Sequence, residues 1–150
     1  MLGEPAAAIL VDANLLIWAY HRQFPLHEPA RAWWAETLSA VPRVGIPWVT
    51  SLAFHRISTH PRALPRPLGI EQAWSVVRGW FERANVSCPG PTERHQALLG
   101  DLLVRGRAGG NHTSDAHPAA LAIEWGLELC GADGDVARYP GLRWRDPLSR

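Results

Sequence analysis

Short apolar runs alternate along the chain with segments whose apolar residues recur at helical spacing. Residues 7–11, "AAILV", form a continuous apolar run, as expected for a strand covered on both faces. Residues 70–84 show the clearest amphipathic helical period. Further strands are expected at 43–48, 85–88, 127–130 and 141–144, and further helices at 14–22, 27–40, 49–59, 92–106 and 115–126. This order predicts an α/β domain with a central, mainly parallel sheet of about five short strands.

The composition is that of one soluble domain. The 150 residues suit a single unit, with a core expected over about residues 7–148. The formal charge of +1 excludes a broadly basic protein that coats nucleic acid. It allows a local groove lined by arginines, because all fifteen basic residues are Arg and none is Lys. The two cysteines fit no metal-ligand spacing, and neither a signal peptide nor a membrane-length apolar run is evident. We therefore expect a cytoplasmic protein without a membrane anchor.

Four aspartates occupy positions that a parallel sheet would bring together. Asp12 directly follows the first apolar run, Asp133 and Asp135 follow the run at 127–130, and Asp115 precedes a helix. The carboxyl ends of parallel strands share one edge, where open α/β sheets bind ligands. Carboxylates gathered there repel one another unless a cation neutralises them, and hard oxygen ligands suit Mg²⁺ or Mn²⁺.

Each acid also has a purely structural interpretation. Asp12 and Asp115 could each cap the helix that follows, and Asp133 and Asp135 could be turn residues in "GADGD". A rival metal is zinc, for which "HTSDAH" offers His112, Asp115 and His117, although no further His or Cys stands at ligand spacing.

Four segments together resemble a known family. They are "VDANLLIWAY", "PWVTSLAFHRISTHPR", "SDAHPAALAIEWG" and "GADGDVARYPGLRWRDPL". Their order and spacing over residues 9–148 resemble the PIN-domain ribonucleases of the VapC toxin type. The resemblance implies a three-layer α/β/α fold and an endoribonuclease, dependent on Mg²⁺ or Mn²⁺, that acts as the toxin of a toxin–antitoxin pair. It also implies tRNA or rRNA as substrate, a VapB-type antitoxin as partner, and a homodimer.

The resemblance assigns roles to individual residues of this chain. Asp12, Asp115 and Asp133 match the metal-binding acids of the family, and Asp135 matches a second late acid that joins them in catalysis. Asn14 and Ser114 match positions that support the site, and Arg56 is the expected RNA contact. Other candidates for phosphate contact are Arg62, Arg66, Arg105 and Arg107.

One departure from the family pattern concerns the activity itself. The family carries a Glu three residues before the arginine of the middle helix, but here that position is Ala53, with Phe54 as the neighbouring choice. Gly131 also replaces a usual hydroxyl residue. We therefore expect a single well-held ion rather than two, with a second ion binding only when the RNA phosphate is an additional ligand. Without RNA, metal binding should be weak. The alternative is a degenerate PIN module that binds RNA or antitoxin without efficient cleavage. An unrelated α/β ligand-binding domain is disfavoured, because no glycine-rich loop follows the first strand.

Overall fold

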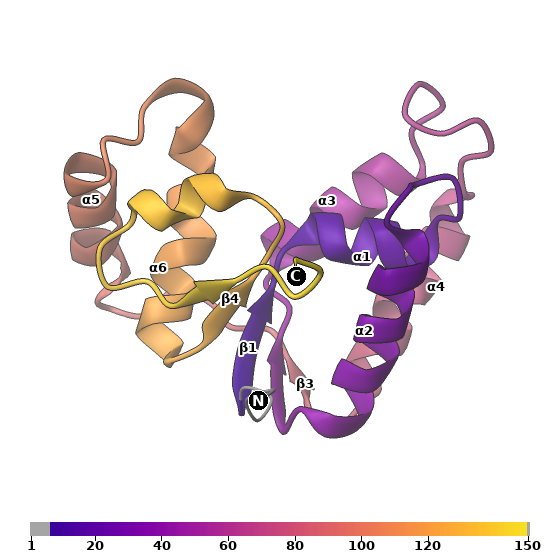
Figure 1. The fold of residues 1–150 in the computed structure, drawn as a ribbon, viewed down its shortest axis with the longest axis horizontal. Helices are drawn as coiled ribbons and strands as arrows, with labels where there is room; N and C mark the ends of the chain where they lie inside the picture. Colours follow the sequence, from indigo (N-terminus) through magenta and orange to yellow (C-terminus); the bar gives the residue numbers. More distant parts are fainter. Residues whose placement is uncertain (1–6, 150) are drawn as a thin grey trace.

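The computed structural model describes residues 7–149, which form a parallel five-stranded sheet between two layers of helices (Figure 1). The strands are β1 (Ala8–Val11), β2 (Arg43–Gly45), β3 (Val86–Ser87), β4 (Glu128–Cys130) and β5 (Trp144–Arg145). The helices are α1 (Ala13–Tyr20), α2 (His27–Ala40), α3 (Trp48–Ser58), α4 (Ile70–Phe81), α5 (His95–Arg105) and α6 (Ala116–Trp125). Two 3₁₀ helices, η1 (Gly110–Asp115) and η2 (Gly134–Arg138), flank β4 and its preceding helix.

The sheet has the order β3-β2-β1-β4-β5, and every neighbouring pair is parallel. Strand β1 is central: Ile9 pairs with Val44 of β2 and with Glu128 of β4, and Leu10 pairs with Gly45 and Leu129. The predicted fold class is thus confirmed, including the three layers. The strands are shorter than the sequence suggests, because the apolar runs continue past the hydrogen-bonded residues into the turns at the sheet edge.

Each face of the sheet has its own core. On one face Ile9 and Val11 of β1 pack with residues of α1 to α4, including Phe54 and Trp80. On the other face Leu10 packs with α5, α6, η2 and residues of the segment 139–144. Figure 1 shows α5 and α6 on one side of the strands and α1 to α4 on the other. Successive residues of β1 therefore serve opposite cores, as the pleat of a strand requires.

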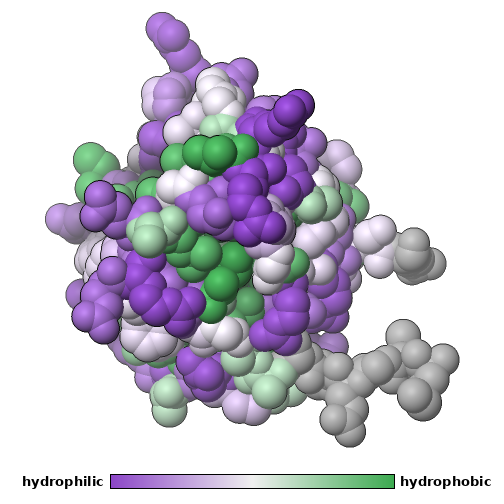
Figure 2. Space-filling model, turned by 90° about the vertical axis from the view of Figure 1, so that its left-hand side faces the viewer, coloured by the Kyte–Doolittle hydropathy of each residue, from purple (hydrophilic) through white to green (hydrophobic). Residues whose placement is uncertain are grey.

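Polar and apolar side chains share the surface of the described residues. On the face over α5 and α6, hydrophilic side chains surround a small group of apolar ones (Figure 2). Val104 of α5 is 78% exposed, and Trp48 and Leu52 of α3 are 55% and 60% exposed. Among residues 7–149, no helix combines the length and the apolar character needed to cross a bilayer.

Candidate active site

Asp12 lies where β1 ends and α1 begins, at the carboxyl edge of the sheet. Its backbone is extended, and its N–H donates to the Cys130 carbonyl oxygen at 2.9 Å, which continues the pairing of β1 with β4 by one residue. Its side chain accepts a hydrogen bond from the Ala13 N–H at 2.9 Å, at the start of α1. The expected cap is therefore present, and the same residue also stands at the predicted ligand-binding edge.

Gly131 packs directly against the Asp12 side chain. A Cβ atom at Gly131 would lie 3.1 Å from the Asp12 Cβ and 3.3 Å from Oδ2. Contacts that short force one of the two residues to shift by a few tenths of an ångström. The glycine that departs from the family pattern thus fixes how closely β4 approaches this carboxylate.

Asp115 and Asp133 belong to the segments on the β4 side of β1: Asp115 precedes α6 and Asp133 follows β4. Asp115 ends η1 and immediately precedes α6, yet its backbone is helical and its side chain makes no capping hydrogen bond. Asp115 therefore stands at the N-cap position of α6, but its side chain does not cap the helix. Asp133 follows β4 and accepts a hydrogen bond from the Asp135 N–H at 2.9 Å, so the turn interpretation holds for this residue.

The three aspartates act on one another electrostatically. Burial raises the pKa of Asp12, the Ala13 N–H lowers it, and the charges of Asp115 and Asp133 raise it again, with a net rise. Burial and then the Asp133 charge raise the pKa of Asp115, against the opposing effects of His112 and Arg138. Asp12, Asp115 and Asp133 thus form a group of mutually repelling acids, called the carboxylate edge below.

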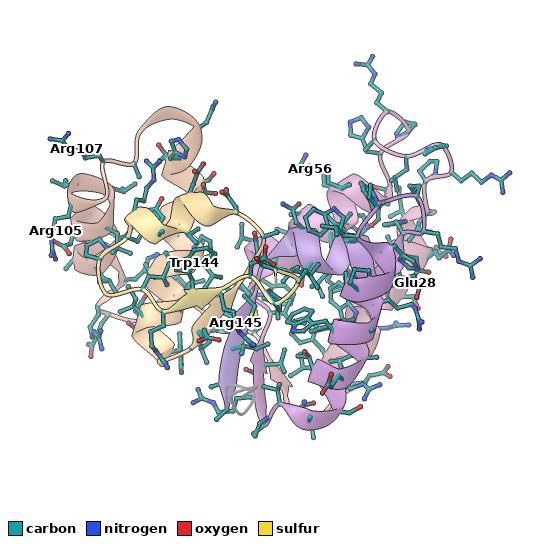
Figure 3. All side chains as sticks on the ribbon, viewed as in Figure 1. Glu28, Arg56, Arg105, Arg107, Trp144 and Arg145 are labelled. Atoms are coloured by element: carbon teal, nitrogen blue, oxygen red, sulfur yellow. The ribbon has the colours of Figure 1, made fainter. Side chains whose placement is uncertain are left out.

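The other expected site residues lie on η2, α1, η1 and α3. Asp135 points toward η1, with Oδ2 at 3.7 Å from the His112 Nδ1. Asn14 and Ser114 are exposed in the first turn of α1 and near the end of η1. Arg56 is exposed on α3, which lies beyond the ends of the strands (Figure 3). Within residues 7–149, no hydrogen bond or ion pair involves the side chains of Asn14, Ser114 or Arg56.

Helix α3 borders the carboxylate edge without supplying an acid. The Thr50 hydroxyl donates to the Val11 carbonyl oxygen at 2.8 Å, immediately before Asp12. Ala53 lies one turn further along the same face and is half-buried, whereas Phe54 is fully buried in an aromatic contact with Trp80. Of the two positions considered for the missing Glu, the structure therefore favours Ala53. No sequence pattern marks Thr50 as the residue that ties α3 to this edge.

Tyr139 is a second residue that the sequence did not indicate. Its hydroxyl donates to the His112 carbonyl oxygen at 3.0 Å, which connects the end of η2 to η1. Burial raises its pKa, and the Asp115 charge adds to the rise. Tyr139 therefore fixes the two 3₁₀ segments that carry Asp115 and Asp135. It precedes a Pro-Gly pair, so its sequence context suggested only a turn.

The donor chemistry of the carboxylate edge fits a hard divalent cation, because the three acids expose oxygen ligands and repel one another without one. Within residues 7–149, no three His, Cys, Asp or Glu side chains stand close enough together to enclose a metal ion. The zinc set does not assemble: the His117 Nδ1 lies 3.0 Å from the His95 Nε2, while His112 faces Asp135.

Curated relatives match almost the entire chain. The chain is 38% identical over 138 residues to Ribonuclease VapC37 of Mycobacterium tuberculosis, covering 92% of this chain and 96% of the relative. It is 36% identical over 140 residues to Ribonuclease VapC33 of the same species, covering 93% and 98%. No family model matches the sequence.

Solved structures share the fold. VapBC-1 from nontypeable Haemophilus influenzae has a TM-score of 0.65 at 20% identity and covers 95% of this chain and 99% of that one. VapC20 of Mycobacterium tuberculosis, described as a toxin that cleaves the sarcin-ricin loop, has a TM-score of 0.60 at 20% identity, covering 91% and 99%. At these identities the likeness concerns the fold.

Proposed function

Because the chain belongs to the VapC family of ribonucleases, we propose that it is an endoribonuclease toxin that cleaves RNA at the carboxylate edge. The observation that carries this proposal is the position of three acids at the ligand-binding edge of the sheet: Asp12 follows β1, Asp133 follows β4 and Asp115 precedes α6, near enough for the charges of Asp115 and Asp133 to raise the pKa of Asp12. Structural capping explains Asp12 in part, but it does not explain why Asp115 makes no capping bond and adds its charge to the same place.

Asp12, Asp115 and Asp133 would hold Mg²⁺ or Mn²⁺. Such an ion supplies Lewis-acid stabilisation of the scissile phosphate and of the leaving oxygen. The chain supplies the positioning: the Ala13 N–H and Gly131 orient Asp12, and the Asp135 N–H orients Asp133. Asp135 adds a fourth carboxylate beside Asp115, close enough for its charge to raise the pKa of Asp115.

Three exposed side chains are free to engage the substrate. Asn14 and Ser114 flank the carboxylate edge with amide and hydroxyl groups that can hydrogen-bond to RNA or to water. Arg56 carries a permanent charge and a guanidinium group that can bind a phosphate through two hydrogen bonds. We assign these residues to orientation of the RNA rather than to the reacting atoms.

Metal binding should be weak until RNA is present. The three carboxylates do not already enclose an ion, and α3 contributes no acid at Ala53. A non-bridging oxygen of the RNA phosphate can complete the ligand set. We therefore expect one firmly held ion in the complex with RNA, and little binding to the protein alone.

The missing Glu also supports a second candidate function. A degenerate member of the family would bind RNA or antitoxin and cleave poorly, because Ala53 leaves one side of the carboxylate edge without a charge. This candidate requires the same fold and the same surface. The two functions differ only in turnover.

One assay separates the two candidates. Purified protein is incubated with tRNA and rRNA in Mg²⁺, in Mn²⁺ or in EDTA, beside an Asp12→Ala variant. Cleavage that requires the metal and disappears in the variant supports the enzyme. Binding of RNA without metal-dependent cleavage by the wild type would replace the enzyme with the degenerate module.

We also propose an antitoxin partner and a homodimer. The solved neighbour from Haemophilus influenzae is a VapBC complex, and this chain exposes Trp48, Val49 and Leu52 along α3. Light scattering should give a mass near twice 16.6 kDa for the isolated chain. A mass of one chain at micromolar concentration would contradict the dimer.

A further inference from the structure

Two loops that lie outside the carboxylate edge meet at one end of the molecule. Residues 21–26 connect α1 to α2, and residues 59–69 connect α3 to α4. Both extend at the same corner in Figure 1. Arg22 and Gln23 of the first loop and Pro65 and Arg66 of the second line a common hollow of about 370 Å³. We call these four residues the arginine corner.

The loops that carry the arginine corner are held in place from inside. The buried His21 side chain hydrogen-bonds through Nε2 to the Ser58 hydroxyl at 2.8 Å. The Leu68 N–H donates to the Ser58 carbonyl oxygen at 2.7 Å, and the side chain of Leu64, within the second loop, is fully buried. Ser58 thus connects both loops. Because the backbones of both loops are already ordered, less binding free energy is spent on ordering them when a ligand binds at the corner.

The charge at this corner is positive and unpaired. No acidic residue lines the hollow, and among residues 7–149 no ion pair involves Arg22 or Arg66. A neighbouring hollow of about 650 Å³ shares Arg22, and its one acid, Glu28, already pairs with Arg31 at 3.2 Å. Between Asp12 and Glu71 the chain carries six arginines and two glutamates. The net charge of +1 for the whole chain conceals this local excess.

Helix α1 connects the corner to the carboxylate edge. Asp12 precedes its first residue, and Arg22 follows its last residue by two positions. A helix of this length spans about 12 Å. A stacked RNA strand covers that distance in about three or four nucleotides, at roughly 3.4 Å for each. Arg56 of α3 lies on the same side of the molecule, beyond the strand ends (Figure 3).

We infer that the arginine corner binds backbone phosphates of the RNA strand, about three or four nucleotides from the bond that is cut. The inference rests on the proposed function for the position of the cut. A guanidinium group suits phosphate oxygens, because it can donate two parallel hydrogen bonds to them. The lining includes two arginines and no acid, so an anionic strand complements the charge of this corner. The corner therefore selects RNA length and not sequence.

The test measures binding apart from cleavage. The Asp12→Asn background stops turnover, and fluorescence anisotropy follows a labelled oligouridylate of about 20 nucleotides over a series of salt concentrations. We expect Arg22→Ala combined with Arg66→Ala to weaken binding on the order of tenfold and to reduce the salt slope by about 1.4, for two lost phosphate contacts. Binding of a trinucleotide should not change. The matched control is Arg83→Ala with Arg94→Ala, which removes two exposed arginines elsewhere.

Each result decides the inference. Loss of long-RNA binding in the corner variant alone supports it, provided that the melting temperature is unchanged. Equal losses in the control variant, or undetectable binding of the long RNA by the parent protein, would overturn it. So would intact RNA binding with loss of binding to an acidic peptide of the antitoxin type. If the wild type fails to cut RNA but the corner effect persists, the proposed enzyme falls while the corner stands.

Discussion

Asp12 combines two roles that make opposite demands on its charge. As a cap it needs only an oxygen acceptor for the Ala13 N–H, which a neutral amide also provides. As part of the carboxylate edge it keeps a charge in a largely buried place, beside two other acids that raise its pKa further. A residue retained only for capping would have no reason to carry that charge. The charge is therefore a cost to folding, and the proposed metal site would account for it.

Replacement of Asp12 by Asn should make the protein more stable and inactive. The amide keeps the cap and removes a desolvated charge together with its repulsion from Asp115 and Asp133. In metal-free buffer we expect the melting temperature to rise by about 2–4 °C for each kcal/mol gained. Added Mg²⁺ with RNA should stabilise the wild type more than the variant. A lower melting temperature for the variant, measured by circular dichroism, would show that the charge itself stabilises the fold.

A glutamate at position 53 should strengthen the site. Ala53 shares a helix face with Thr50, whose hydroxyl hydrogen-bonds to the Val11 carbonyl oxygen directly before Asp12. An acid at position 53 therefore adds a carboxylate beside the carboxylate edge. We expect Ala53→Glu to raise kcat/KM for RNA by about 10–100-fold, the range typical of partners that orient metal ligands. Because the position is half-buried, stability should fall by about 1 kcal/mol. Ala53→Gln has the same size without the charge, and equal gains in both variants would exclude an electrostatic effect.

At the scale of elements, a buried polar network joins α5 to α6. The Glu124 side chain of α6 is fully shielded from solvent and accepts hydrogen bonds from the Thr92 N–H and hydroxyl and from the His95 Nδ1. The His95 ring in turn reaches His117 in the first turn of α6. Burial alone would raise the pKa of Glu124, but the bonds from Thr92 and His95 outweigh it and the net pKa is lowered. The network therefore holds in place the helix that follows Asp115.

Glu124→Gln should destabilise the protein at neutral pH by about 1.5–3 kcal/mol, the value of a hydrogen bond to a charged group. A lowered pKa means that the folded state holds the charged form more firmly than the unfolded chain does. The contribution is then complete above the ordinary value of 4.5 and is lost as the pH falls through the lower folded value. Urea unfolding of both proteins between neutral and acid pH measures this difference, which should shrink below about pH 4.5.

Glu93→Gln is the matched control, since Glu93 is exposed in the same segment. It should leave the unfolding free energy within about 0.5 kcal/mol of the wild type. If the difference between the wild type and Glu124→Gln grew on acidification, the assigned direction of the pKa would be incorrect.

At the scale of the whole molecule, apolar pattern and strand order explain how much could be anticipated. The run at 7–11 and the amphipathic period at 70–84 are local signals, so they predicted β1 and α4 closely. Asp12 and Asp133 could be placed at one edge because parallel strands share their direction. The bond from Thr50 to Val11, the packing of Gly131 on Asp12 and the meeting of Arg22 with Arg66 depend on residues far apart in the chain. No local pattern encodes such contacts, and only the fold reveals them.

Because both cores share β1, the protein should unfold in one cooperative transition. Ile9 faces one core and Leu10 the other, and each is at most 1% exposed. Loss of either side chain loosens the central strand that both layers of helices need. We expect Ile9→Ala and Leu10→Ala each to cost about 2–5 kcal/mol, and calorimetry should show a single transition in the wild type and both variants. Two resolved transitions, or a Leu10→Ala effect confined to one of them, would mean that the helical layers unfold independently.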